Sequence, residues 1–211
     1  MSGPRFDAAF QAGLLRLFQL RRDVRQFRPD PVDPAIVRGL LQTARLAPSV
    51  GLSEPWRFVL VDDPERRRRI RSEFARCNAA ALAAQPQDRA GLYARLKLAG
   101  LDQAPCHVAV FADAATEQGH GLGRQTMPEA LDYSVVMAVH TLWLAARAAG
   151  LGLGWVSIVR PAEILRVLEV PASWRFIGYL CLGYPELEAD TPELERAGWE
   201  RRAEAALILQ R

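Results

Sequence analysis

The sequence is poor in the residues from which disulfide frameworks and metal sites are built. Its 211 residues contain three cysteines and three histidines. Cys77, Cys106 and Cys181 lie far apart and form no CxxC pair, which favours reduced core residues of a cytoplasmic protein. The histidines belong to no HExxH motif and have no cysteine partner, so we predict no metal site.

An uninterrupted apolar stretch long enough to cross a membrane is also missing. Asp132, His140, Arg147 and the glycines of 150–154 interrupt the most apolar segment, residues 127–159. The first ten residues, MSGPRFDAAF, contain no basic region followed by an apolar one, so no signal peptide is expected. We therefore predict a cytoplasmic protein without membrane spans.

Common nucleotide-binding and hydrolase motifs are lacking as well. The glycines of GHGLGRQ, residues 119–125, do not have GxGxxG spacing, and no GK[ST] follows them. GLGLG at 150–154 follows a predicted helix and enters a strand, which is the reverse of the Rossmann order. There is no GxSxG elbow for a serine nucleophile.

A nucleic-acid surface is not supported by charge. The formal net charge is only +3, and no aromatic residues alternate with the arginine run at 66–71. We predict a solvated helix face there, with Ile70 and Phe74 buried, and no nucleic-acid partner.

The chain's most informative feature is a long apolar helix expected between Thr126 and Gly150. Thr126 and Glu129 form a possible capping box, Pro128 fits a first turn, and Gly150 can end the helix in the left-handed conformation. Its few polar residues fall on one narrow stripe. A helix this apolar is expected at the centre, against a sheet and a second subunit.

The remaining sequence alternates predicted helices with buried strands. Helices are expected at 7–20, 34–46, 64–85, 88–99 and 161–169, and strands at 57–61, 107–113, 154–159 and 176–185. This order favours one α+β domain, residues 1–211, with a mixed central sheet covered by helices. A C-terminal extension, residues 186–211, ends in the apolar stretch ALILQ and is expected to pack, plausibly on another subunit.

The motif RRDVRQF, residues 21–27, is the strongest binding candidate. At helical spacing Arg21 and Arg25 share a face, and forked guanidinium groups suit a phosphate. A surface salt-bridge patch is an equally open interpretation of these residues.

Together these segments resemble the flavin-dependent nitroreductase family. The resemblance rests on RRDVRQF, on APSVGLSEPWRFV from residue 47, on GLGLGWVSI from residue 150 and on CLGYP from residue 181. Asp23, Ser157, the loop GHGLGRQTMPE and the tail ELERAGWERR are similar to those members that consume their flavin. Glu54 and Leu52 depart from the glutamine and asparagine that are frequent in the family.

The resemblance implies a nitroreductase-like fold and a homodimer with FMN at the subunit interface. The arginines near the N-terminus and in the tail would hold the phosphate and ribityl chain, and residues 119–128 would form a lid. The implied FMN-binding residues are Arg21, Arg22, Arg25, Ser49, Val50, Gly51, Trp155, Val156, Ser157, Arg201 and Arg202.

The reaction implied by the resemblance is the oxygen-dependent fragmentation of reduced FMN. Its products would be erythrose 4-phosphate and 5,6-dimethylbenzimidazole, the lower ligand of cobalamin. Asp23 would act as a catalytic base, and the Ser157 hydroxyl would donate a hydrogen bond to a flavin oxygen. A separate NAD(P)H-dependent flavin reductase would supply reduced FMN.

Two other functions stay open from the sequence. One is an NAD(P)H-dependent FMN nitroreductase or flavin reductase, which needs room for nicotinamide above the flavin. The other is a flavin- or corrinoid-binding protein without turnover.

Overall fold

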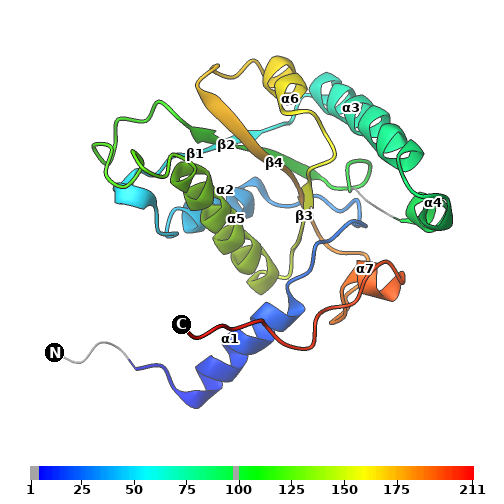
Figure 1. The fold of residues 1–211 in the computed structure, drawn as a ribbon, viewed down its shortest axis with the longest axis horizontal. Coiled ribbons are helices and arrows are strands. Elements are labelled where there is room, and N and C mark those ends of the chain that lie inside the picture. Colours follow the sequence, from blue (N-terminus) through cyan, green and yellow to red (C-terminus); the bar gives the residue numbers. More distant parts are fainter. Residues whose placement is uncertain (1–4, 97–99) are drawn as a thin grey trace.

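The computed structural model describes residues 5–96 and 100–211 and is built around a four-stranded sheet (Figure 1). The strand order is β1-β2-β4-β3, and each neighbouring pair is antiparallel. The strands are β1 (Trp56–Leu60), β2 (Cys106–Asp113), β3 (Gly152–Val156) and β4 (Trp174–Gly183). The helices are α1 (Ala8–Leu20), α2 (Pro34–Ala44), the short 3-10 helix η1 (Val50–Leu52), α3 (Pro64–Ala83), α4 (Gln87–Arg95), α5 (Ala130–Ala148), α6 (Pro161–Leu168) and α7 (Glu193–Arg196).

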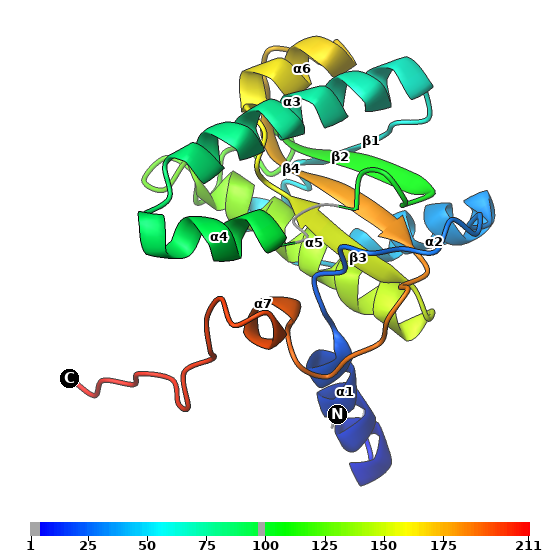
Figure 2. The same ribbon diagram turned by 90° about the vertical axis from the view of Figure 1, so that its right-hand side faces the viewer.

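Helices cover both faces of the sheet, as Figures 1 and 2 show. α2 and α5 pack on one face, and α3 and α6 on the other. β2 supplies both cores because side chains alternate along a strand. Its Val108 and Val110 join the cluster under α5, whereas Ala109 and Phe111 join the cluster under α6. The predicted α+β class and element order are therefore confirmed.

The sheet differs from the predicted mixed sheet. Among the described residues its only parallel pairing is an isolated bridge between Asp23 and Leu153 of β3. The strand expected at 154–159 is observed two residues earlier and ends at Val156. It ends there because the Arg160 N–H and side chain bind Glu73 of α3, which draws 157–160 away from the sheet. The end of the predicted helix 88–99 lies outside the described residues at 97–99.

α5 begins later than the sequence predicts. Ala130 is its first residue, and no side chain caps it. The Thr126 capping box is wrong because residues 127–130 form a separate turn, in which the Ala130 N–H donates to the Met127 carbonyl. The predicted end is confirmed: Gly150 has φ +75°, and the Leu151 N–H donates to the Ala146 carbonyl at 2.8 Å, as in a Schellman motif.

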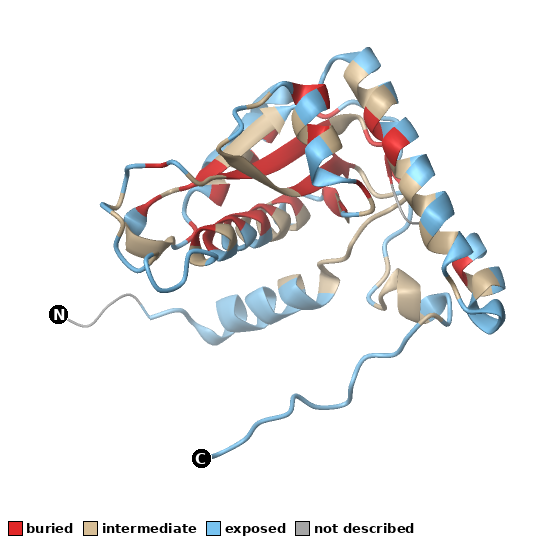
Figure 3. Cartoon of the chain, turned by 45° about the horizontal axis from the view of Figure 1, so that its top comes forward, coloured by how far each residue is buried: buried red, intermediate tan, exposed pale blue. Residues whose placement is uncertain are grey.

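Only one side of α5 is buried within the chain (Figure 3). Val135, Ala138 and Leu142 are fully covered by the sheet, whereas Tyr133 and Val136 on the opposite side are 54% and 41% exposed. The helix thus meets the sheet as predicted but presents a second apolar face to the outside. No described helix is long and apolar enough to cross a membrane.

The arginine run of α3 behaves as a helix face paired with acids. Arg68 pairs with Glu65 and Arg71 with Asp102, while Ile70 is fully buried and Phe74 partly so. The predicted solvated face is confirmed for Arg68 and Arg71, whereas Arg66 and Arg67 are half-buried because their guanidinium groups donate to the carbonyls of Val167 and Pro105.

A buried polar pair joins β2 to β4. His107 Nδ1 lies 2.9 Å from the Tyr179 hydroxyl, and Nε2 lies 3.1 Å from the Ala104 carbonyl oxygen. Since a carbonyl only accepts, Nε2 carries the proton and Nδ1 accepts from Tyr179. Burial and, to a smaller extent, the nearby Arg67 charge lower the pKa of His107 to about 4, so the imidazole is neutral at pH 7.

This histidine makes stability depend on pH. Its folded pKa of about 4 lies below the ordinary histidine value of 6.5, so between these pH values the unfolded chain binds a proton that the folded chain does not. The free energy of unfolding is expected to fall by about 3 kcal/mol as the pH decreases from 6.5 to 4. Urea unfolding at several pH values checks this. His107→Gln should lose most of the slope, and an unchanged slope in that variant would assign it to other groups.

Candidate functional site

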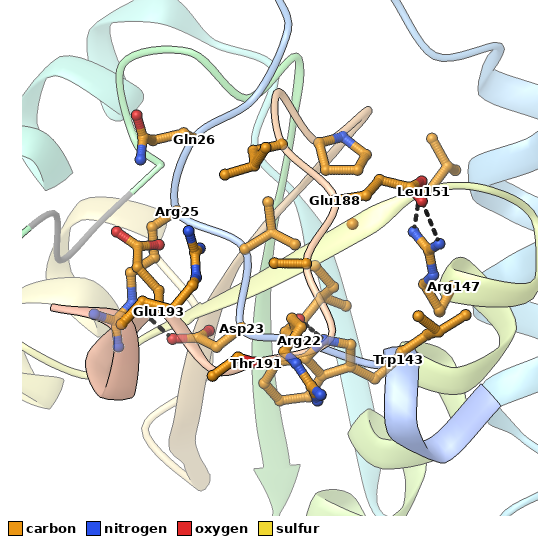
Figure 4. A pocket seen from close by; sticks show the side chains of 18 of the residues that line it. Arg22, Asp23, Arg25, Gln26, Trp143, Arg147, Leu151, Glu188, Thr191 and Glu193 are labelled. Atoms are coloured by element: carbon orange, nitrogen blue, oxygen red, sulfur yellow. Dashed lines mark hydrogen bonds and ion pairs between the residues drawn. The ribbon is translucent and has the colours of Figure 1, made fainter. Parts of the chain in front are cut away.

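The N-terminal arginine segment lies along the free edge of β3 (Figure 4). α1 ends at Leu20, and the Val24 N–H then donates to the Leu153 carbonyl at 3.1 Å. Arg21 to Arg25 are therefore extended, and the helical spacing assumed for them is wrong. Because Val24 pairs with β3, the helix does not continue beyond Leu20, and the arginines lie at this edge of the sheet.

Asp23 fixes this segment to the strand. Its Oδ1 accepts the Trp155 N–H at 2.8 Å, and its Oδ2 lies 2.9 Å from Arg25 Nε. The carboxylate side chain is 33% exposed, so it still faces open space. An ionised carboxylate with unused lone pairs can accept a further hydrogen bond or a proton.

Glycine allows the close approach of the two chains. A Cβ on Gly154 would lie 2.0 Å from the Val24 carbonyl oxygen, and one on Gly152 would lie 2.7 Å from a Val24 methyl. Gly152 and Gly154 therefore allow Val24 to pack directly on β3.

A tryptophan on α5 supports the arginines from below. Trp143 Nε1 donates to the Arg22 carbonyl at 3.0 Å, and the Arg21 guanidinium lies 4.8 Å from the Trp143 ring centroid. The centroid of the Trp155 ring lies 6.3 Å from the centroid of the Trp143 ring. Trp143 is not among the residues singled out from the sequence. No local signal distinguishes a supporting tryptophan from a core one.

Two adjoining cavities open around this segment. The larger, about 290 Å³, is lined by Arg22, Asp23 and Arg25 together with residues from α5, β3 and the tail. The smaller, about 130 Å³, is lined by Arg21, Arg22, Asp23, Arg25, Pro192, Glu193, Leu194 and Arg202. Four of the five predicted arginines thus meet, and Arg201 lines neither cavity.

The electrostatics of the smaller cavity favour an anion. Burial lowers the pKa of Arg21 and Arg22, and the charge of Arg202 lowers both as well, although Asp23 raises that of Arg21. Arg22 Nε is buried and has no hydrogen-bond partner among the described residues. A phosphate would offset the mutual repulsion and could satisfy this nitrogen. The donor set therefore fits FMN.

The segment Ser49–Val50–Gly51 lies elsewhere in the chain. It leads into β1, at the opposite edge of the sheet from β3, roughly 14 Å away by strand spacing. The Val50 N–H donates to Ser134 Oγ at 3.0 Å, and Ser49 Oγ accepts the Glu54 N–H at 3.1 Å. Within one chain, the structure does not bring these residues to the arginines.

The predicted lid, residues 119–128, packs on that same segment. A Cβ on Gly51 would lie 2.8 Å from the Leu122 carbonyl oxygen, and Gln118 Nε2 donates to the Leu52 carbonyl at 2.8 Å. Leu52 has φ +56° and, like Leu122, is 72% exposed. The lid and the 49–51 loop therefore form one apolar tip that the chain itself leaves uncovered.

Ser157 follows β3 directly and is exposed, but it lines neither cavity. It lies two residues beyond Trp155, whose N–H binds Asp23, so about 7 Å of extended chain separates them. The side chain of Val156 is buried in the core, which leaves only its backbone for a ligand.

Glu73 is a supporting residue that sequence reasoning missed. Its buried carboxylate accepts from Arg160 Nε at 2.8 Å, from the Arg160 N–H at 3.2 Å and from Arg76 Nη2 at 2.8 Å. Hydrogen bonds from Arg160 and Arg76 hold the pKa of Glu73 far below its usual range. A carboxylate three residues after the buried Ile70 is the one available signal. Glu73 anchors the loop that carries Ser157.

No metal-binding group of three His, Cys, Asp or Glu side chains occurs among the described residues.

Comparison with known proteins identifies the relatives of this chain. The model of the nitroreductase family matches residues 19–184. The chain is 61% identical to the 5,6-dimethylbenzimidazole synthase of Rhodospirillum rubrum, over 95% of both proteins. It is 47% identical to a 5,6-dimethylbenzimidazole synthase of Rhodobacter capsulatus, over 92% of this chain and 94% of that one.

A solved structure shares the fold at low sequence identity. The structure of oxidized iodotyrosine deiodinase bound to FMN and 3-iodo-L-tyrosine has a TM-score of 0.72 and 22% identity. The match covers 93% of this chain and 97% of that one.

Gly154→Ala tests whether the site depends on close packing of the arginine segment against β3. The added methyl would force Val24 and Asp23 off the strand. We expect the free energy of unfolding to fall by about 1–3 kcal/mol and FMN binding to weaken in a fluorescence titration. Gly39→Ala in α2, where a Cβ meets nothing within 4 Å, is the matched control. It should leave FMN binding unchanged and raise the free energy of unfolding by up to about 1 kcal/mol, because alanine favours a helix more than glycine does. Equal behaviour of the two variants would contradict this role.

Proposed function

The chain belongs to the nitroreductase family, and we propose that it is a 5,6-dimethylbenzimidazole synthase. In this proposal it fragments reduced FMN with O2 to 5,6-dimethylbenzimidazole and erythrose 4-phosphate, as one domain spanning residues 1–211. The observation that carries the proposal is the 61% identity to a synthase over 95% of both chains. The NAD(P)H nitroreductase alternative is supported by more distant similarity, such as 23% identity to a putative NAD(P)H nitroreductase of Bacillus subtilis.

The arginine cavity supplies the binding end of the site. Arg21, Arg22, Arg25 and Arg202 would hold the phosphate, with the unpartnered Arg22 Nε as one donor. Reduced FMN, when bound, would supply both the ring that is contracted and electrons for O2. A separate NAD(P)H-dependent flavin reductase would deliver it, because the reaction consumes its flavin.

Asp23 is the proposed proton acceptor. Its position is fixed by Trp155 and Arg25, and it lines both cavities. A fixed carboxylate needs little reorganisation to take up a proton. Ser157, on a loop held by Glu73 and Arg160, would donate a hydrogen bond to the ring.

We also propose a homodimer, with each flavin between two chains. The 49–51 loop and the arginines lie at opposite edges of one sheet, so a second copy could bring them together. The apolar surface for such an interface is present on α1, α5 and the tail. It comprises Phe6, Phe10, Leu14, Leu15, Phe18, Tyr133, Val136, Met137, Leu207, Ile208 and Leu209. The cytoplasmic location in the proposal is supported by three free cysteines.

Product analysis tests the activity. Anaerobic protein with reduced FMN is exposed to air, and 5,6-dimethylbenzimidazole is measured by chromatography. Asp23→Asn is expected to lower the rate at least 100-fold, since an amide cannot accept the proton. Ser157→Ala should lower it about 10-fold or more by removing one hydrogen bond.

The matched control for Asp23→Asn is Asp62→Asn, whose carboxylate is 85% exposed and lies outside both cavities. It should keep the full rate. Product formation by Asp23→Asn at the wild-type rate would refute the assigned base. Rapid NADPH oxidation by the protein alone, with total flavin conserved, would favour the nitroreductase instead.

A charged substitution on α5 tests the proposed dimer interface. Val136→Glu places a charge on the exposed apolar face of α5 and should yield a monomer in analytical ultracentrifugation, because an interface does not tolerate a buried unpaired charge. FMN affinity should fall in parallel, since half of the site would be missing. Ala79→Glu, on an exposed position of α3, is the control. A Val136→Glu dimer with intact FMN binding would argue against this interface.

A further inference from the structure

The segment after β4 returns to the arginine cavity through α7. The Arg22 guanidinium donates to the Asp190 carbonyl, and Pro192, Glu193 and Leu194 line the small cavity. α7 then ends in a Schellman motif. Gly198 has φ +75°, and the Trp199 N–H donates to the Leu194 carbonyl at 2.8 Å. This turn ends the helix and leads the chain to α4.

Trp199 is held on α4 by two ring interactions. Its ring packs edge-to-face on Tyr93 at a centroid distance of 6.0 Å and an interplanar angle of 66°. The Arg89 guanidinium lies 5.2 Å from the Trp199 ring centroid. Contacts of both kinds are attractive. Together they can hold a short tail segment in one place.

The platform under Trp199 is itself rigid. Tyr93 is only 8% exposed, and its hydroxyl donates to Asn78 Oδ1 of α3 at 2.8 Å. α4 is thereby tied to the layer of helices on the far face of the sheet. Trp199 is the last residue of the chain that is not exposed, within the part that the structure describes.

Arg202 follows Trp199 by three residues and lines the small cavity with Arg21, Arg22 and Arg25. Its neighbour Arg201 lines neither cavity, and the Arg201 N–H is bonded to the carboxylate of Glu200. Beyond Trp199 the tail is exposed, so a guanidinium there would sample a large volume unless the preceding ring were fixed.

We propose that Trp199 is a positioning residue that holds Arg202 over the arginine cavity by packing on α4. The tail arginine that binds the anion is then Arg202 and not Arg201, and α4 is coupled to the phosphate end of the site. This inference rests on the proposed function, since it takes the anion to be the FMN phosphate.

The test compares FMN with riboflavin, which lacks the phosphate. Dissociation constants for both flavins are measured by fluorescence quenching on the full-length protein. Arg202→Ala should weaken FMN binding about 10- to 100-fold, the range for one charge-assisted contact, and leave riboflavin binding unchanged. Trp199→Ala should reproduce this phosphate-specific loss. Trp199→Phe, which keeps an aromatic ring against Tyr93 and Arg89, should restore most of the affinity, and Arg201→Ala should bind as wild type.

The double variant Trp199→Ala/Arg202→Ala identifies the route of the effect. If Trp199 acts through Arg202, the double variant binds FMN no more weakly than Arg202→Ala alone. Additive losses, or equal weakening of riboflavin by Trp199→Ala, would overturn the inference. Arg89→Ala should give a smaller loss of the same kind and serves if Trp199→Ala does not fold.

Failure of this inference is distinguishable from failure of the proposed function. If Arg21→Ala and Arg202→Ala lower the FMN preference but Trp199→Ala does not, the phosphate site stands and the positioning role is refuted. If none of these variants changes the preference for FMN over riboflavin, the phosphate site itself is refuted.

Discussion

The carboxylate of Asp23 is the interaction on which the site depends. By accepting the Trp155 N–H and pairing with Arg25, it joins the segment after α1 to the edge of the sheet. Edge strands expose unpaired backbone groups, and here the N-terminal segment covers part of that edge. The same contact places three guanidinium groups beside the tail. The Asp23 side chain therefore holds the N-terminal segment on this edge of the sheet and also lines the cavity.

The cost of this arrangement is electrostatic. Burial and the charge of Arg202 lower the pKa of Arg21 and Arg22, and the acidic groups of Asp23, Asp190 and Glu195 offset this only in part. Cations brought together without enough counter-charge destabilise the empty fold and favour an anionic ligand. Trp143 lessens the cost by placing its ring against Arg21. The cluster is better explained by anion binding than by stability, which favours the binding interpretation over a surface salt-bridge patch.

The sequence predicted what local chemistry determines. Gly150 ends α5 because a left-handed residue is needed there, and β2 was recognised by its continuous apolar side chains. The errors lie where distant contacts override local preference. Arg21 to Arg25 leave the helix because Val24 pairs with Leu153, and β3 ends before Ser157 because Glu73 binds Arg160. Both partners are more than 80 residues away in sequence, so no window of local pattern contains them. The resemblance named four arginines that the fold brings to one cavity, but only the fold separates Arg202 from Arg201.

The division of the implied FMN residues between two sheet edges has a physical consequence of its own. The apolar tip of Leu52 and Leu122 and the exposed face of α5 lie on the side of the molecule that the chain leaves uncovered, whereas the arginine cavity is built entirely from one chain. If a second copy covers that face, phosphate binding and ring binding are contributed by different protomers. Affinity for the phosphate would then survive in a separated chain, while contacts to the ring would be lost. The reaction would then depend on dimer formation, because the flavin ring is contacted by the second protomer. The arginine cluster would bind the FMN phosphate first.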